Sequence, residues 1–275
     1  MSRVIAIANQ KGGVGKTTTS TNLSASLAEL GKKVLVVDID PQGNATSGLG
    51  IDKNNLENTL YELFVGECEL EECLISDALE NLSVLPSNVN LSGAEIELIG
   101  VDKREYILKK NLEKIRDNYD YIIIDCPPSL NILTVNALSA ADSVLVPIQC
   151  EYYALEGLSQ LVYTINLVKK RLNPNLTMEG VVFTMYDART NLSLEVVENV
   201  KNNLKQNIYK TIIPRNIKLA EAPSRGMPIN IYDPKSAGAE SYKLLAEEVI
   251  NHNEEDSYVP QKIVERKTKK HGRKK

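Results

Sequence analysis

The chain has 275 residues, 43% hydrophobic and 25% charged, with a net charge of −4, which is typical of a soluble protein with a sizeable core of its own. The absence of Trp and the presence of only two Phe argue against an aromatic platform for single-stranded nucleic acid, and the four cysteines lack the spacing of a zinc site. The longest apolar runs are too short to cross a bilayer and no signal peptide precedes the first predicted strand, so we expect a cytoplasmic protein.

The first predicted elements are a strand, a glycine-rich loop and a helix. The apolar run Val4 to Ala8 is followed by Asn-Gln-Lys-Gly-Gly-Val-Gly-Lys-Thr-Thr-Thr at positions 9–19, and a helical pattern runs from Thr17 to Leu30. Glycines allow backbone N–H groups to point inward, and the positive end of a helix favours anions. Lys16 can reach the β- and γ-phosphates of a nucleotide, and the Thr17 hydroxyl can bind Mg²⁺. The loop therefore predicts a triphosphate site in preference to an ordinary glycine turn.

The loop departs from the general phosphate-loop pattern at two positions. Gln10 stands where that pattern has a glycine, and Lys11 precedes the first glycine. In this respect the loop resembles the deviant Walker A motif of the ParA/MinD family of ATPases, in which the early lysine reaches the phosphates of a partner subunit. The resemblance implies that Lys11 acts in trans and that Lys11 and Lys16 serve catalysis. The nucleotide-binding residues that it implies in this loop are Lys11, Gly12, Gly13, Val14, Gly15, Lys16, Thr17 and Thr18.

Two acids follow the second predicted strand, Lys33 to Asp38. This strand is apolar without alternation, as in a parallel sheet covered on both faces, and completes a βαβ unit. Ligands of such sheets lie at the carboxyl ends of the strands, where Asp38 and Asp40 stand, although Asp-Pro-Gln-Gly-Asn could also be a simple turn. The run resembles the family's switch I. This implies that Asp40 positions or deprotonates the attacking water and that Asp38 lies in the outer shell of Mg²⁺.

Residues 51–118 suggest no chemistry, but a second strong signal follows them. Helices are expected at Leu56 to Val65 and at Ile96 to Ile115, with a short strand at Leu82 to Pro86. Tyr-Ile-Ile-Ile-Asp-Cys-Pro-Pro at 121–128 then predicts a buried strand that ends in an acid and is stopped by two prolines. It resembles Walker B and switch II, which implies that Asp125 holds Mg²⁺ through water.

Two later loops carry basic residues. They follow the predicted strands Thr177 to Thr184 and Tyr209 to Ile213, and a strand at Ser143 to Ile148 and a helix over 155–172 precede them. Without the family, these loops would be read as solvated basic segments. The resemblance to ParA and Soj proteins places Pro214 and Asn216 against adenine. It also implies a DNA-facing surface, where relatives often carry arginine at the position of Lys218; the residues concerned are Arg189, Arg215, Lys218 and Arg225.

The chain is expected to close with a helix, Ala237 to Ile250, and a disordered basic tail, 251–275. Residues 262–275 carry eight basic side chains and one acidic one, so the rest of the chain is strongly acidic. Only Ile263 and Val264 could anchor this tail in lipid, too few for a stable membrane anchor. The tail could add nonspecific phosphate contacts or aid solubility.

The expected fold is a single α/β domain, residues 1–250, of the P-loop NTPase type, with a twisted, mostly parallel sheet and helices on both faces. The resemblance implies an ATP hydrolase that requires ATP and Mg²⁺, dimerises with ATP, binds double-stranded DNA nonspecifically and is nucleoid-associated. It also implies slow turnover stimulated by DNA and by a ParB-like centromere-binding protein in chromosome segregation, and it leaves open a role in replication initiation. The alternatives are a MinD-like membrane-cycling division regulator and an ATP-dependent iron-sulfur reductase that uses Cys126 and Cys150.

Overall fold

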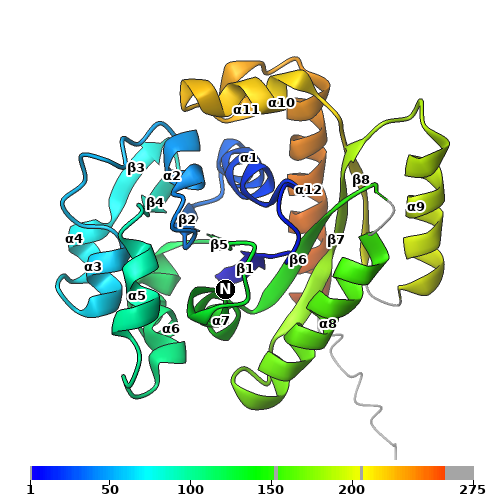
Figure 1. Ribbon diagram of the computed structural model, residues 1–275. Helices are drawn as coiled ribbons and strands as arrows, with labels where there is room; N and C mark the ends of the chain where they lie inside the picture. Colours follow the sequence, from blue (N-terminus) through cyan, green and yellow to red (C-terminus); the bar gives the residue numbers. More distant parts are fainter. Residues whose placement is uncertain (1, 152–153, 205–206, 258–275) are drawn as a thin grey trace, which may run out of the picture.

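One eight-stranded sheet organises the computed structural model, which describes residues 2–151, 154–204 and 207–257 (Figure 1). The strand order is β3-β4-β2-β5-β1-β6-β7-β8, and every neighbouring pair is parallel except β3 with β4. The strands are β1 (Arg3–Ile7), β2 (Val34–Asp38), β3 (Ile75–Leu79), β4 (Leu82–Leu85), β5 (Tyr121–Asp125), β6 (Ser143–Gln149), β7 (Thr177–Tyr186) and β8 (Ile208–Pro214). The first strand therefore lies in the middle of the sheet, between β5 and β6.

Helices cover both faces of the sheet, and each face has its own apolar core. One core lies under α1 (Lys16–Glu29), α2 (Asn44–Gly48), α10 (Ile217–Glu221), α11 (Ile229–Tyr232) and α12 (Ala237–Ser257). The other lies under α3 (Leu60–Val65), α4 (Leu70–Cys73), α5 (Leu91–Glu97), α6 (Ile107–Ile115), α7 (Ile132–Ala140), α8 (Ala154–Arg171) and α9 (Asn191–Asn203). Short 3₁₀ turns η1 (Arg104–Tyr106), η2 (Arg116–Asn118) and η3 (Ala222–Arg225) complete the described chain. Alternate residues of β1 enter opposite cores, which explains why the central strands contain no polar alternation.

The predicted fold class is confirmed, with differences in the local elements. The single helix expected from Ile96 to Ile115 is wrong: α5 ends at Glu97 and α6 begins at Ile107. Gly100 between them has a φ of +90°, a left-handed conformation that interrupts a helix. The edge strand β3 was not predicted because its side chains are half-buried or exposed and show no apolar alternation.

The C-terminal helix is longer than predicted. It continues to Ser257, beyond the expected boundary at Ile250, so the first part of the predicted tail is helical. The remaining residues of that tail lie outside the described residues. None of the helices in the described part of the chain combines the length and the apolar character needed to cross a membrane.

Candidate nucleotide-binding site

The glycine-rich loop connects the central strand β1 to helix α1. Gly13 and Gly15 have φ values of +74° and +87°, a left-handed backbone that glycine adopts without strain. Helix α1 begins at Lys16 with no side-chain cap and no acid in its first turn, so its first N–H groups and its positive end face the loop. The Lys16 ammonium donates to the Lys11 carbonyl at 3.0 Å. Burial lowers the pKa of Lys16, and the nearby Asp125 carboxylate opposes this effect.

Side chains from neighbouring strands hold the loop in place. The Thr184 hydroxyl at the end of β7 donates to the Val14 carbonyl at 2.8 Å. The Asn9 amide donates to the Pro147 carbonyl at 2.8 Å, and its side-chain oxygen accepts from the Lys11 backbone N–H at 3.0 Å. The shape of the loop therefore depends on β6 and β7 as well as on its own glycines.

Thr184→Val should loosen this loop. The change keeps the size of the side chain but leaves the buried Val14 carbonyl without its donor, which should cost about 1–3 kcal/mol of unfolding free energy and weaken nucleotide binding. Thr177→Val is the matched control on the same strand, because the Thr177 hydroxyl is exposed. Thermal unfolding and nucleotide titration of both variants measure the difference, and equal effects would contradict the role of Thr184.

Two buried carboxylates lie side by side at the carboxyl edge of the sheet. Asp38 of β2 pairs in register with Asp125 of β5. Asp38 accepts hydrogen bonds from the Thr46 backbone N–H at 2.8 Å and from its hydroxyl at 2.7 Å. Asp125 accepts one from the Ser20 hydroxyl through Oδ1 at 2.7 Å. The Thr17 side chain lies close enough to lower the pKa of Asp125, but the buried Oδ2 has no hydrogen bond of normal geometry.

The electrostatics of this pair favour a bound cation. Burial raises the pKa of both carboxyl groups, and for Asp125 the neighbouring Asp38 charge acts in the same direction. A buried carboxylate with an unpaired oxygen is unstable unless a positive charge offsets it. Carboxylate and hydroxyl oxygens are the hard ligands that Mg²⁺ prefers, and Thr17 lies in the first turn of helix α1. The residues present therefore fit the predicted magnesium site of Thr17, Asp38 and Asp125.

The segment that resembles switch I is braced from the loop after β4. Asp40 is only 8% exposed, and its carboxylate accepts from the Gln42 backbone N–H at 2.9 Å. The Ser87 hydroxyl donates to the Asp40 carbonyl at 2.8 Å, and the Ser87 N–H donates to the Thr46 hydroxyl at 3.0 Å. Gly43 has a φ of +58°, and a Cβ there would lie 2.5 Å from the Ser87 carbonyl oxygen, so a side chain cannot be accommodated. Ser87 thus gives the previously unassigned region 51–118 a structural part in the site.

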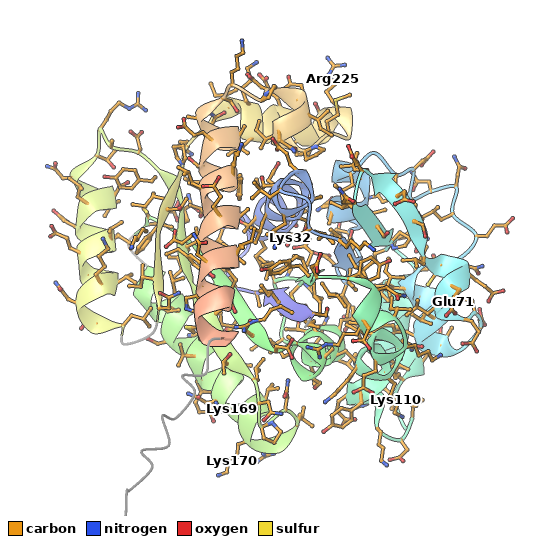
Figure 2. All side chains as sticks on the ribbon, turned by 180° about the vertical axis from the view of Figure 1, so that it is seen from behind. Lys32, Glu71, Lys110, Lys169, Lys170 and Arg225 are labelled. Carbon is orange, nitrogen blue, oxygen red and sulfur yellow. The ribbon has the colours of Figure 1, made fainter. Side chains whose placement is uncertain are left out.

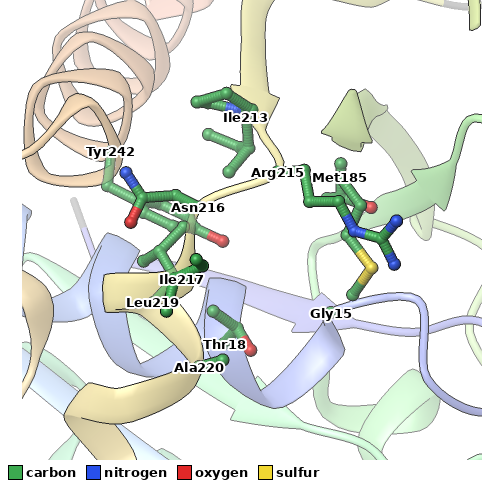
Figure 3. Close-up of a pocket in the computed structure, with 12 residues that line it drawn as sticks. Gly15, Thr18, Met185, Ile213, Arg215, Asn216, Ile217, Leu219, Ala220 and Tyr242 are labelled. Atoms are coloured by element: carbon green, nitrogen blue, oxygen red, sulfur yellow. The ribbon is translucent and has the colours of Figure 1, made fainter. Parts of the chain in front are cut away.

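A cavity of about 330 Å³ lies beside the loop (Figure 3). Asn216 and Tyr242 stand on one side and Met185 and Arg215 on the other, with Thr18 below them. Pro214 is also in the wall, so the structure places both residues predicted for adenine at this cavity. The sequence did not indicate Met185 or Tyr242 in this position, because their elements lie far from the loop along the chain.

The predicted basic residues follow neighbouring elements at the same edge of the sheet. Tyr186 of β7 pairs with Pro214 of β8, and the Arg215 N–H donates to the Tyr186 carbonyl at 2.9 Å, which brings the loops of Arg189 and Arg215 together. Lys218 lies on α10 and Arg225 on η3, and Figure 2 shows Arg225 at the opposite end of the molecule from Lys169 and Lys170.

Three of the predicted functional cations are already paired with acids. The Lys11 ammonium lies 2.6 Å from Glu151, which follows β6. Arg189 pairs with Asp187 at 2.7 Å, and Lys218 pairs with Glu221 at 2.9 Å. The sequence analysis predicted the cations but not these acidic partners.

A phosphate loop after the central strand of a parallel sheet, with acids at the ends of two neighbouring strands, defines the class of P-loop nucleotide-binding proteins. Residues 2–178 match the model of a family described as an AAA domain, AAA_31. The chain is 59% identical over 249 residues to the sporulation initiation inhibitor protein Soj of Bacillus subtilis, covering 90% of this chain and 98% of that protein. It is 54% identical over 251 residues to the chromosome partitioning protein ParA of Myxococcus xanthus, covering 91% and 89%.

A solved structure shares the whole architecture. The cobyrinic acid a,c-diamide synthase from Mycobacterium smegmatis with bound ATP analog and magnesium superposes with a TM-score of 0.82 at 39% identity, covering 93% of this chain and 97% of that one. The chain belongs to the ParA/Soj family of chromosome-partitioning ATPases, as the resemblance of its loops predicted.

Proposed function

We propose that this chain is an ATP- and Mg²⁺-dependent switch that dimerises around ATP, binds double-stranded DNA without sequence preference and acts with a ParB-like centromere-binding protein in chromosome segregation. The observation that carries this proposal is the shared wall between the nucleotide cavity and the basic loops. Pro214, Arg215 and Asn216 are consecutive, and all three line the cavity. Arg215 also belongs to the predicted DNA surface, so nucleotide and DNA would act on one short segment.

The roles in hydrolysis follow from the contacts of the site. Lys16 would exchange the Lys11 carbonyl for the β- and γ-phosphates, and the uncapped start of α1 would hold the same phosphates. Asp40 would orient the attacking water and accept its proton, since Ser87 and Gln42 fix its position. Thr17, Asp38 and Asp125 would hold Mg²⁺, which would neutralise charge on the phosphates.

Dimerisation requires a change at Lys11. In the single chain its ammonium is engaged by Glu151 at 2.6 Å. Both side chains remain partly exposed, at 37% and 47%, so the pair can open toward a partner subunit. ATP bound in the partner would then replace Glu151 as the counterion of Lys11.

The test is binding of the Asp40→Ala variant to duplex DNA of arbitrary sequence, with ATP and with ADP, across a salt series. Without the proposed base, the ATP state should persist and bind DNA, whereas the ADP state should not. Four cations from each subunit would give a log–log salt slope of roughly −7, at about 0.9 per neutralised phosphate. Asp102→Ala, which removes an exposed acid between α5 and η1, is the matched control and should behave as wild type.

Two outcomes of this test would contradict the proposal. Equal binding with ATP and ADP would overturn the switch, and no binding in either state would favour the membrane-cycling alternative, whose candidate anchors Ile263 and Val264 lie outside the described residues.

The iron-sulfur alternative is disfavoured by the environment of its cysteines. Cys126 and Cys150 are 1% and 6% exposed, and burial raises the pKa of both thiols, which disfavours the thiolate form that binds iron.

A further inference from the structure

Arg189 and Asp187 form a two-point ion pair at the end of β7. The Arg189 Nε donates to Asp187 Oδ1 at 2.8 Å, and Nη2 donates to Oδ2 at 2.7 Å. The Arg189 backbone N–H also donates to Oδ1, at 3.0 Å. These hydrogen bonds hold the pKa of the Asp187 carboxyl well below its usual range. The arginine side chain is nevertheless 87% exposed, whereas that of Asp187 is 20% exposed.

The geometry leaves one edge of the guanidinium available. A guanidinium carries five N–H donors in a rigid fork, and Asp187 uses the edge formed by Nε and Nη2. The edge formed by Nη1 and the second N–H of Nη2 has the parallel spacing that matches two phosphate oxygens. We propose that Asp187 is a positioning residue that presents this second edge of Arg189 to a DNA phosphate.

The loop fixes the backbone of Asp187 independently of the Arg189 side chain. Its carbonyl accepts from the Thr190 backbone N–H at 3.1 Å and from the Thr190 hydroxyl at 3.0 Å. Thr190 in turn caps α9, so the backbone of Asp187 is tied to both β7 and α9, and its carboxylate bonds the Arg189 backbone N–H as well as the guanidinium. The arginine rotamer is therefore ordered when the loop folds rather than when DNA arrives, which reduces the entropy lost on binding. This inference rests on the proposed DNA-binding function and adds to it a positioning role for Asp187.

The pair of Lys218 and Glu221 provides a contrast within the same surface. The Lys218 ammonium lies 2.9 Å from Glu221, which also accepts from the Tyr232 hydroxyl at 3.0 Å. An ammonium is a point charge with rotatable donors and has no second edge to orient. Glu221 therefore only competes with a phosphate for Lys218. Asp187 also repels a phosphate, but in addition it orients Arg189, the residue that would bind that phosphate.

Neutralising Asp187 should then weaken DNA binding, whereas neutralising Glu221 should strengthen it. The measurement is the affinity of the full chain, in the Asp40→Ala background with ATP, for a fluorescent duplex of arbitrary sequence. Asp187→Asn retains an oxygen for the backbone turn but removes the acceptor of Nη2, and it should weaken binding about twofold to tenfold although a negative charge is lost. Glu221→Gln should tighten binding by up to about threefold.

An Arg189→Lys background separates positioning from simple charge. A lysine offers no fork to orient, so Asp187→Asn in that background should leave the affinity unchanged or increase it. ATP-dependent dimer formation, measured by size-exclusion chromatography, should be the same for all of these variants and shows that the loop remains folded.

The outcomes distinguish this inference from the proposed function. Unchanged DNA binding by Arg189→Ala would remove Arg189 from the DNA surface and overturn this inference, while the proposed function would stand. The proposed function itself would fail if the Asp40→Ala protein bound DNA equally with ATP and with ADP, or in neither state. Weaker binding by Arg189→Ala together with tighter binding by Asp187→Asn would keep Arg189 as a DNA contact and overturn only the positioning role, since Asp187 would then merely compete with the phosphate.

Discussion

Lys16→Ala should abolish ATP-dependent dimerisation and lower the rate of ATP hydrolysis by two to three orders of magnitude or more, by the magnitude expected for loss of a charged transition-state contact. Lys16 is the cation at the start of α1, and its ammonium is free to leave the Lys11 carbonyl for a phosphate. The variant should fold normally. Burial lowers the pKa of the Lys16 ammonium, which means that the charged group destabilises the nucleotide-free fold, and its removal takes this unfavourable contribution away. Light scattering measures dimerisation, ATPase assays measure hydrolysis, and thermal unfolding without nucleotide measures the stability of the fold.

The control for this experiment is Lys33→Ala, which removes an exposed lysine before β2 and the same amount of charge. In the wild type and in this control, ATP should raise the temperature of thermal unfolding through binding to the folded state. In Lys16→Ala that increase should be lost while the unfolding temperature without nucleotide is kept. Normal ATP-dependent dimers of Lys16→Ala would contradict the assignment of the site.

Asp125→Asn should raise the free energy of unfolding of the nucleotide-free protein and abolish Mg²⁺-dependent ATP hydrolysis. It removes a buried carboxylate whose Oδ2 has no hydrogen bond of normal geometry and whose neighbour is the acid Asp38. Burial raises the pKa of Asp125 above its value in the unfolded chain, so at neutral pH this group favours the unfolded state, and a neutral amide of the same shape relieves this cost. We expect a gain of roughly 1–3 kcal/mol, or several degrees in the unfolding temperature without Mg²⁺, together with a loss of Mg²⁺-dependent hydrolysis.

The pH dependence of that gain has a definite sign. An acid with a raised pKa in the fold costs stability as the pH rises above the ordinary pKa of aspartate, because the unfolded chain ionises first. The gain from Asp125→Asn should therefore grow as the pH rises from about 4, the ordinary pKa of aspartate, toward the raised pKa of Asp125 in the fold, and it should vanish below pH 4.

Asp38→Asn serves as the comparison for Asp125→Asn. The Asp38 carboxylate accepts from Thr46 and from the Asp40 N–H, and an amide in either orientation would leave a buried donor unpaired. It should therefore give no gain in stability. If Asp125→Asn lowered the unfolding temperature as much as Asp38→Asn does, the electrostatic account of this pair would be wrong.

The parts of the site that the sequence predicted are those encoded by contiguous residues. The loop from Gly12 to Thr18 and the strands ending at Asp38 and Asp125 each combine an apolar run with polar residues at a fixed spacing. Pro214 and Asn216 were assigned through resemblance alone, and the structure places them in the wall of a cavity beside the loop.

The parts that the sequence did not predict depend on contacts between distant elements. Thr184 reaches the loop at Val14 only because β7 lies near β1, and Ser87 reaches Asp40 only because β4 is next to β2. A single hydroxyl carries no local signal of such a contact. The error over 96–115 has a different cause, since apolar spacing continues through Gly100 while its backbone turns away from the helical conformation.

The pair of Lys11 and Glu151 would make the proposed dimerisation an exchange of counterions rather than a simple addition. In the proposed dimer each subunit supplies one Lys11, so two such pairs must open for one dimer to form. At the modest strength of a partly exposed pair, up to about 1 kcal/mol each, the dimer would be disfavoured by as much as about thirtyfold. The free-energy cost of opening two pairs would keep the subunits apart until ATP, bound in both subunits, provides a stronger counterion for each Lys11.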